Sequence, residues 1–233
     1  MTRLLLTALL SLLALAPAAH AAAGDTVLSD ERIVSRHGYA NVRAPVRAAP
    51  DAGAERVDRL RYRTEDGLPE VYLALRSRLV DDAEWLRIRL PGRPNGRTGW
   101  IPRDALGPLT RLTTYFEVDR RRLRATLYEG GERVWRSRVG VGAPGTPTPK
   151  GRFYIRQRLR NLGGSPLYGP WAFGTSAYSV LSDWPGGGVV GIHGTDQPQL
   201  LPGRVSHGCV RVPNAAIRRL ARLMPIGTPV RIR

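Results

Sequence analysis

Two short segments in the second half of the chain contain the residue types needed for acyl transfer by a thiol. Residues 192–195 include His193, and residues 206–212 include His207 and the only cysteine, Cys209. A thiol at its ordinary pKa is mostly protonated at neutral pH, and a neighbouring imidazole can take the proton and stabilise the thiolate. These residue types predict a cysteine nucleophile with a histidine base. Composition alone leaves open which histidine is the base.

Glycines flank both segments and would let the backbone approach a substrate closely. Gly208 directly precedes Cys209, and consecutive amides at this point could bind the oxyanion of a tetrahedral intermediate. The base would also need a third group that fixes its tautomer. The composition therefore suits acyl transfer.

Two other interpretations of the same residues remain open. The histidines could be ordinary core residues beside an inert, buried cysteine. Alternatively, His193, His207 and Cys209 could hold a catalytic zinc ion with one open position. The absence of a carboxylate near His207 in the sequence counts against zinc, because ligating histidines are usually oriented by such a group.

The N-terminus predicts an exported protein. Arg3 precedes an apolar stretch at residues 4–16, Pro17 follows it, and Ala19-His20-Ala21 is a small-residue cleavage site. This is the layout of a secretory signal peptide, predicted here for residues 1–21, and the apolar stretch is too short to span a bilayer. The alternative is an N-terminal core helix, but the segment has no polar face. We expect a mature chain in the periplasm or cell wall, with no membrane span and no internal disulfide.

The chain is strongly basic, with a formal net charge of +17. Such a charge suits nucleic acid, an anionic membrane surface or an anionic polymer as a partner. The predicted export argues against nucleic acid. Lys150 is the only lysine, and the many arginines are scattered along the sequence, which favours a solvated surface over a dedicated patch. A cationic exterior would favour approach to anionic wall polymers.

The first part of the chain predicts a small β-barrel. Residues 85–90 alternate apolar and charged side chains with a period of two, as in a half-buried strand, and residues 71–75 and 98–102 predict further strands. The order of Asn-Val-Arg, Trp-Leu-Arg-Ile and Gly-Trp-Ile-Pro resembles the bacterial SH3-like domain, over residues 34–107. In that domain the final Gly-Trp usually serves the core, so we expect Trp100 to be structural.

The second part, after Gly107-Pro108, predicts a β-rich domain with one helix. A Gly- and Pro-rich loop covers residues 140–151, and residues 162–188 form a loop-rich, aromatic segment interpreted as an ordered lid or a core flap. Ile217, Leu220, Ala221 and Met224 have helical spacing after Pro213-Asn214. The remaining runs predict strands at residues 114–118, 123–128, 133–141, 153–155 and 228–232.

Together these segments resemble the L,D-transpeptidase catalytic domain (the YkuD-like family) over residues 111–233. His193-Gly194 and Ser206-His207-Gly208-Cys209 match the family's His-Gly and Ser/Thr-His-Gly-Cys elements, and residues 141–153 and 168–174 also match in order. The expected fold class is therefore mainly β. An SH3-like β-barrel would be followed by an L,D-transpeptidase-type β-sandwich with a lid loop and one C-terminal helix.

The resemblance implies specific roles for the residues. Cys209 would be the nucleophile and His193 the general base, oriented by the backbone carbonyl of Gly194 instead of a carboxylate. The amides of Gly208 and Cys209 would stabilise the oxyanion, and Ser206 and His207 would shape that site.

Three further side chains are predicted to bind substrate. Family signatures often have Asn two residues after the cysteine, where this chain has Arg211, a forked donor suited to a carboxylate. Trp171 and Tyr178 are the aromatic candidates in residues 162–188.

The implied reaction begins on a peptidoglycan stem peptide and needs no cofactor and no metal. Cys209 would attack the carbonyl of the third residue of a tetrapeptide stem, release the terminal D-alanine and form a thioester. An amine of a second stem would then complete a 3-3 cross-link. Water as acceptor would make the enzyme an L,D-carboxypeptidase, and a protein lysine would anchor a protein to the wall. A non-catalytic wall-binding protein is the alternative from another class.

Overall fold

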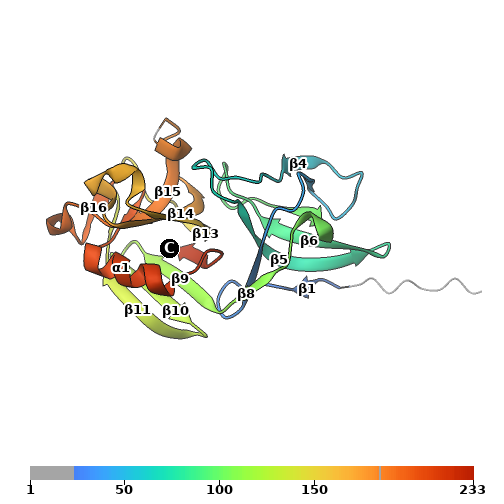
Figure 1. The fold of residues 1–233 in the computed structure, drawn as a ribbon, viewed down its shortest axis with the longest axis horizontal. Helices are drawn as coiled ribbons and strands as arrows, with labels where there is room; N and C mark the ends of the chain where they lie inside the picture. The colour runs from blue at the N-terminus through green and yellow to red at the C-terminus, as the bar shows by residue number, and fades with distance from the viewer. Residues whose placement is uncertain (1–23, 184) are drawn as a thin grey trace, which may run out of the picture.

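The computed structural model describes residues 24–183 and 185–233, so the predicted signal peptide lies outside the described residues. Within this part of the chain, the strands form two sheets and α1 (Asn214–Leu223) is the only α-helix (Figure 1). This confirms the prediction of a mainly β protein with one C-terminal helix. Short 3-10 turns lie at Arg103–Ala105, Leu162–Gly164, Pro166–Tyr168, Pro185–Gly188 and Pro198–Leu200.

The strands before Thr113 form a sheet that we call the N-terminal sheet. They are β1 (Thr26–Val27), β2 (Ser35–Tyr39), β3 (Pro45–Arg47), β4 (Arg56–Arg59), β5 (Val71–Val80), β6 (Ala83–Arg89), β7 (Thr98–Pro102) and β8 (Thr110–Leu112). Their order is β4-β3-β7-β6-β5-β2-β8, with β1 paired to β5. Trp100 is buried, as expected of a structural residue. The assignment of this sheet to the SH3-like class stays a prediction.

The strands after Thr113 form the C-terminal sheet. They are β9 (Thr114–Asp119), β10 (Arg124–Glu129), β11 (Glu132–Arg138), β12 (Gly140–Gly142), β13 (Gly151–Arg160), β14 (Trp171–Tyr178), β15 (Val189–His193), β16 (Gly203–Ser206), β17 (Val210–Arg211) and β18 (Pro229–Ile232). Their order is β11-β10-β9-β18-β13-β14-β15-β17-β12-β16. The change of sheet falls at Thr113, because β8 still pairs with β2 even though it follows Gly107-Pro108.

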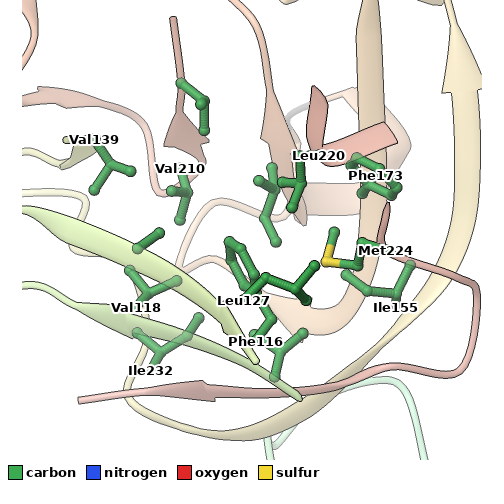
Figure 2. Close-up of a cluster of buried hydrophobic side chains, with 14 of the residues drawn as sticks. Phe116, Val118, Leu127, Val139, Ile155, Phe173, Val210, Leu220, Met224 and Ile232 are labelled. Carbon is green, nitrogen blue, oxygen red and sulfur yellow. The ribbon is translucent and has the colours of Figure 1, made fainter. Parts of the chain in front are cut away.

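One apolar core lies between the two halves of the C-terminal sheet. Phe116 and Leu127 come from β9 and β10, Phe173 from β14 and Val210 from β17, and all point into the same space (Figure 2). Helix α1 covers this core with Ile217, Leu220 and Ala221, the residues whose spacing predicts its buried face.

The structure of residues 162–188, interpreted above as an ordered lid or a core flap, differs from that prediction in one respect. Its middle, Trp171–Tyr178, is strand β14, which pairs with both β13 and β15. This strand was not predicted for two reasons. Its glycine and aromatic residues weaken the strand pattern in the sequence, and burial on both faces removes the alternation of apolar and polar residues by which strands are identified. Residues 161–170 therefore lie between β13 and β14, and residues 179–183 and 185–188 lie between β14 and β15.

The two sheets are joined by buried polar contacts. Arg156 on β13 is 1% exposed, and its Nε donates to Glu70 Oε1 of the N-terminal sheet at 2.9 Å. A second guanidinium nitrogen of Arg156 contacts the other oxygen of Glu70 and also lies 3.0 Å from Glu65 Oε2. Tyr154 adds a hydrogen bond from its hydroxyl to the carbonyl of Val71, at 3.0 Å.

Further contacts from the N-terminal sheet fix the segment after β14. The guanidinium of Arg93 donates to the carbonyl oxygens of Ser179, Leu181 and Gly187 at 2.8, 3.0 and 3.0 Å. The side chain of Asn95 exchanges two hydrogen bonds of 2.8 Å with the backbone of Tyr178. The N-terminal sheet thus positions one border of the cavity described next.

Candidate active site

Cys209 follows a tight turn between β16 and β17. Gly208 has a φ of +120°, a conformation that favours glycine, and a Cβ there would lie 3.0 Å from Ser179 Oγ. The Ser206 hydroxyl donates to the carbonyl of Cys209 at 2.5 Å and accepts from the Gly208 N–H at 3.2 Å. Ser206 and Gly208 therefore fix the backbone that presents the thiol.

His193 ends strand β15, which runs parallel to β17. Ile192 pairs with Val210, and His193 pairs with Arg211, so the imidazole is one strand away from the cysteine. The ring is buried, and its Nδ1 lies 2.6 Å from the carbonyl oxygen of Gly194. Because a carbonyl can only accept, Nδ1 carries the hydrogen and Nε2 of the neutral ring has a free lone pair.

Neighbouring residues hold this imidazole in place. Asn214, the first residue of α1, accepts the N–H of Thr195 at 2.9 Å. A Cβ on Gly194 would lie 2.3 Å from the same Asn214 oxygen, so the orienting residue has to be glycine here. The ring of Tyr168 meets His193 edge-on, with the ring centroids 5.1 Å apart.

Gly191 on β15 is adjacent to both the Cys209 sulfur and the His193 ring. Its N–H donates to Cys209 Sγ at 3.3 Å. A Cβ at Gly191 would lie 3.6 Å from His193 Cδ2 and 3.7 Å from Cys209 Sγ. The missing side chain therefore leaves open the space that the thiol and the ring share.

Cys209 and His193 line one cavity of about 320 Å³. Its walls are largely apolar, from β13, β14 and the segments around them. The other lining residues are Asp66, Gln157, Leu159, Leu162, Gly163, Ser165, Tyr168, Ala172, Phe173, Gly174, Gly186, Val189 and Gly191. A largely apolar cavity that is lined by both a thiol and a base is suited to acyl transfer.

Burial shifts the two titrating groups in opposite directions. It raises the pKa of the Cys209 thiol, although the Gly191 N–H and the charge of Arg211 act to lower that pKa. Burial also lowers the pKa of His193 to about 4; the Gly194 carbonyl opposes this effect and Arg211 adds to it. At neutral pH the pair therefore rests as a thiol and a neutral imidazole.

The buried imidazole makes the fold sensitive to acid. His193 has a pKa of about 4 in the folded chain against 6.5 as its ordinary value, so the unfolded chain takes up the proton first as pH falls. The stability contributed by the neutral ring is complete above pH 6.5 and is lost towards pH 4. When the pH falls from 7 to 4.5, the unfolding free energy of the wild type should decrease by about 2 to 3 kcal/mol more than that of His193→Gln. Urea unfolding at the two pH values measures this, and His207→Gln is the matched control. An equal decrease in unfolding free energy in the wild type, His193→Gln and His207→Gln would contradict this prediction.

Two predicted residues lie near the cavity without lining it. Arg211 is buried on β17, and its guanidinium donates to Gln197 Oε1 at 3.2 Å. His207 is exposed, and its carbonyl accepts the Ser179 hydroxyl at 3.1 Å. Arg211 therefore acts on the site through its charge, and its binding of a substrate carboxylate stays a prediction.

The two aromatic candidates occupy the ends of β14, away from the cavity. Trp171 lies against Arg158, whose guanidinium carbon is 5.6 Å from the ring centroid. The Tyr178 hydroxyl bonds to Glu65 at 2.5 Å and accepts from Arg156 at 3.2 Å, in the contact between the sheets. Neither side chain is brought to Cys209.

The cavity also includes residues that the sequence analysis did not identify. Asp66 comes from the N-terminal sheet, about 140 positions before the cysteine, and no motif connects the two. Tyr168 lies within the matched segment 168–174, which could have indicated it. Gly191 directly precedes the Ile192-His193 pair, and its role needs the register between β15 and β17.

Neither a metal site nor a membrane helix is found in the part of the chain that the structure describes. There, no three side chains of His, Cys, Asp or Glu converge closely enough to hold a metal ion. Across residues 24–183 and 185–233, none of the helices has the length and apolar character needed to cross a bilayer.

Comparison with known families gives an independent result. Residues 113–232, more than half of the chain, match the model of the L,D-transpeptidase catalytic domain, YkuD. The chain belongs to this family. The match confirms the resemblance predicted for the second part of the chain, and both Cys209 and His193 fall within it.

Two curated relatives carry the same family name. The YkuD protein of Bacillus subtilis (strain 168) is 38% identical over 94 residues, which cover 40% of this chain and 50% of that protein. The YkuD protein of Bacillus licheniformis is 36% identical over 106 residues, which cover 46% of this chain and 57% of that protein. The chain thus spans about half the length of the curated relatives it matches.

Solved structures of L,D-transpeptidases are also similar to the chain. The C442S mutant of the Enterococcus faecium enzyme is 28% identical with a TM-score of 0.42, and the alignment covers 52% of this chain and 49% of that one. An L,D-transpeptidase from Mycobacterium tuberculosis H37Rv is 14% identical with a TM-score of 0.45, covering 83% of this chain and 95% of that one.

Proposed function

We propose that this L,D-transpeptidase family member forms a thioester between Cys209 and a peptidoglycan tetrapeptide stem, and transfers it to an amine acceptor. The observation that carries the proposal is the hydrogen bond from His193 Nδ1 to the Gly194 carbonyl, 2.6 Å long. It leaves Nε2 as an acceptor in the same cavity as the thiol. The chain's only cysteine thus has a base that is neutral and correctly protonated at physiological pH.

In the first half-reaction the Cys209 thiol gives its proton to His193 Nε2 as the sulfur attacks the carbonyl of the third stem residue. The S–C bond forms, and the carbonyl oxygen becomes an oxyanion next to the backbone amide of Cys209. The C–N bond to the terminal D-alanine then breaks, and the leaving amine takes the proton from the imidazolium. The products are a thioester, free D-alanine and a neutral His193.

In the second half-reaction an amine of another stem attacks the thioester. Its proton passes to His193, the new C–N bond forms, and the S–C bond breaks. The thiolate then recovers a proton from the imidazolium. The product is a 3-3 cross-link, and the largely apolar walls of the cavity favour the amine over water by limiting hydrolysis.

The place of action follows from two features of the sequence. The predicted signal peptide at residues 1–21 supports export, to the periplasm or the cell wall. The net charge of +17 supports approach to anionic wall polymers around the stem peptides.

The proposal is tested by mass spectrometry of the purified protein after incubation with a synthetic tetrapeptide stem. The expected result is an adduct with the mass of the acyl tripeptide, mapped by digestion to the peptide that contains Cys209. With a second stem as acceptor, the expected product is a cross-linked dimer. An acyl group on another residue would contradict Cys209 as the nucleophile. No adduct and no released D-alanine would favour a non-catalytic wall-binding protein. Release of free tripeptide despite the acceptor would indicate an L,D-carboxypeptidase.

A further inference from the structure

Among the described residues that line the cavity around Cys209, one side chain has a net charge at neutral pH, and that charge is negative. It belongs to Asp66, in the loop that precedes β5 of the N-terminal sheet. The remaining lining side chains are apolar or neutral, and His193 is neutral because its pKa is about 4. Arg211 is buried beside the cavity and acts on Cys209 and His193 through its charge, but it does not line the cavity. Among the described residues the lining has a carboxylate and no arginine or lysine, so in a chain with a net charge of +17 the lining at Asp66 favours a cationic group.

Contacts of Asp66 and of the two residues before it hold this loop at the cavity. Gln157 on β13 is buried; its Oε1 accepts the Thr64 hydroxyl at 2.7 Å, and its Nε2 donates to Asp66 Oδ2. Glu65 is bound to Arg156 at 3.0 Å and to the Tyr178 hydroxyl at 2.5 Å. Asp66 is exposed at the border of the cavity, and Gln157 holds one of its carboxylate oxygens. A carboxylate has about four lone-pair positions, so Asp66 can accept further hydrogen bonds.

Strand register relates Asp66 to the nucleophile. Gln157 pairs with Gly174, Gly174 pairs with Gly191, and Cys209 directly precedes the Val210 that pairs with Ile192. The two glycines form a floor without side chains between Gln157 and the cysteine. A Cβ on Gly174 would lie 2.7 Å from Gln157 Nε2, and one on Gly191 would lie 3.7 Å from Cys209 Sγ.

These separations limit the length of the group that fits between the sulfur and Asp66. Directly paired residues have Cβ positions about 5 Å apart, so Sγ lies at most about 11 Å from Gln157 Nε2. A carbonyl under attack lies about 3 Å from the sulfur. An extended side chain of five bonds reaches about 6 Å from its Cα. The bond from the carbonyl carbon to Cα adds about 1.5 Å, and a hydrogen bond to a carboxylate spans about 3 Å. The total of about 13.5 Å lets a side-chain ammonium on the attacked residue reach Asp66, which is hydrogen-bonded to Gln157 Nε2.

We propose that Asp66 is a specificity residue that binds the side-chain ammonium of a diamino acid at the third position of the donor stem. This inference rests on the function proposed above. The ammonium donates to the Asp66 carboxylate while the carbonyl of the same residue lies at Cys209 Sγ. The N-terminal sheet thereby takes part in choosing the substrate.

The test compares two synthetic tetrapeptide donors, one with lysine and one with norleucine at the third position. Norleucine has a similar side-chain length and no ammonium. We measure the second-order rate constant of thioester formation with the full-length protein, without any acceptor. The wild type should prefer the lysine donor by about tenfold, as expected for a hydrogen bond to a charged group. Asp66→Asn should lower the rate with lysine by the same factor and leave the rate with norleucine unchanged.

Asp82→Asn is the matched control, because Asp82 is an exposed carboxylate in the turn between β5 and β6, outside the cavity. It should leave both rates unchanged. An unchanged preference in Asp66→Asn, or an equal loss with both donors, would overturn the inference while thioester formation at Cys209 still stands. A defect confined to transfer onto an added amine would assign Asp66 to the acceptor and also overturn it. A wild type that reacts with neither donor would remove the proposed function itself.

Discussion

Replacing His193 with alanine is expected to lower the rate of thioester formation at Cys209 by about 10³-fold, the middle of the range for a lost general base. The effect should be large because burial raises the pKa of the thiol, so little thiolate forms without a base. His193 has the free Nε2 and lies in the cavity, whereas His207 is exposed and outside it. Single-turnover mass spectrometry with a tetrapeptide stem measures the rate.

His207→Ala is the control, and its rate should stay within about fivefold of the wild type, since a residue that only shapes the site has a smaller effect. Cys209→Ala gives the baseline without a nucleophile. His193→Asn provides a second variant, because the Asn amide nitrogen takes the position of Nδ1 and can still donate to the Gly194 carbonyl while lacking a basic nitrogen. A loss in His207→Ala equal to that in His193→Ala would move the base role to His207.

Replacing Glu70 with alanine is expected to lower the free energy of unfolding by about 3 kcal/mol, because it leaves a buried charge without its main partner. Glu70 and Arg156 are both buried, and burial opposes the charge of Arg156 while Glu70 raises its pKa. The expected loss is at the lower end for such pairs, because Glu65 and the Tyr178 hydroxyl remain in contact with the guanidinium. Urea unfolding at neutral pH measures it.

Two further variants separate this charge effect from a general weakening of the N-terminal sheet. Glu84→Ala removes an exposed glutamate from β6 and should change the unfolding free energy by no more than about 0.5 kcal/mol. Glu70→Leu combined with Arg156→Met removes both charges and should recover most of the loss. A cost for Glu70→Ala no larger than that of Glu84→Ala would show that the pair does not hold the sheets together.

Two strands of the N-terminal sheet and the helix could be predicted from sequence, because turn residues bound the strands and the helix has one buried and one solvated face. Residues 85–90 and 98–102 correspond to β6 and β7, and the helical spacing of Ile217 and Leu220 corresponds to α1. Predictions were less complete at the centre of the C-terminal sheet. Strand β13 extends from Gly151 to Arg160, well beyond the three residues predicted, because Arg156 and Gln157 are buried against the N-terminal sheet and read as solvent-facing polar residues.

The same limit applies to the candidate site. Cys209 and His193 could be identified because each lies in a short motif, and local backbone fixes both. Asp66 could not, because only the docking of the N-terminal sheet brings it to the cavity, through Gln157 and neighbours of no recognisable pattern. Tyr178 is aromatic and close in sequence to the cavity residue Gly174. Its hydroxyl nevertheless bonds to Glu65 and Arg156, in the contact between the two sheets.

The position of β18 in the C-terminal sheet sets an order of assembly. This strand, Pro229–Ile232, lies between β9 and β13, so it joins the first strand of the sheet to the strands that lead to the cavity (Figure 1). The half with β9 to β11 and the half with Cys209 cannot pair through β18 until residues 229–232 have been synthesised. Such pairings, distant in sequence, form slowly. The two halves of the C-terminal sheet are therefore joined through β18 late in folding.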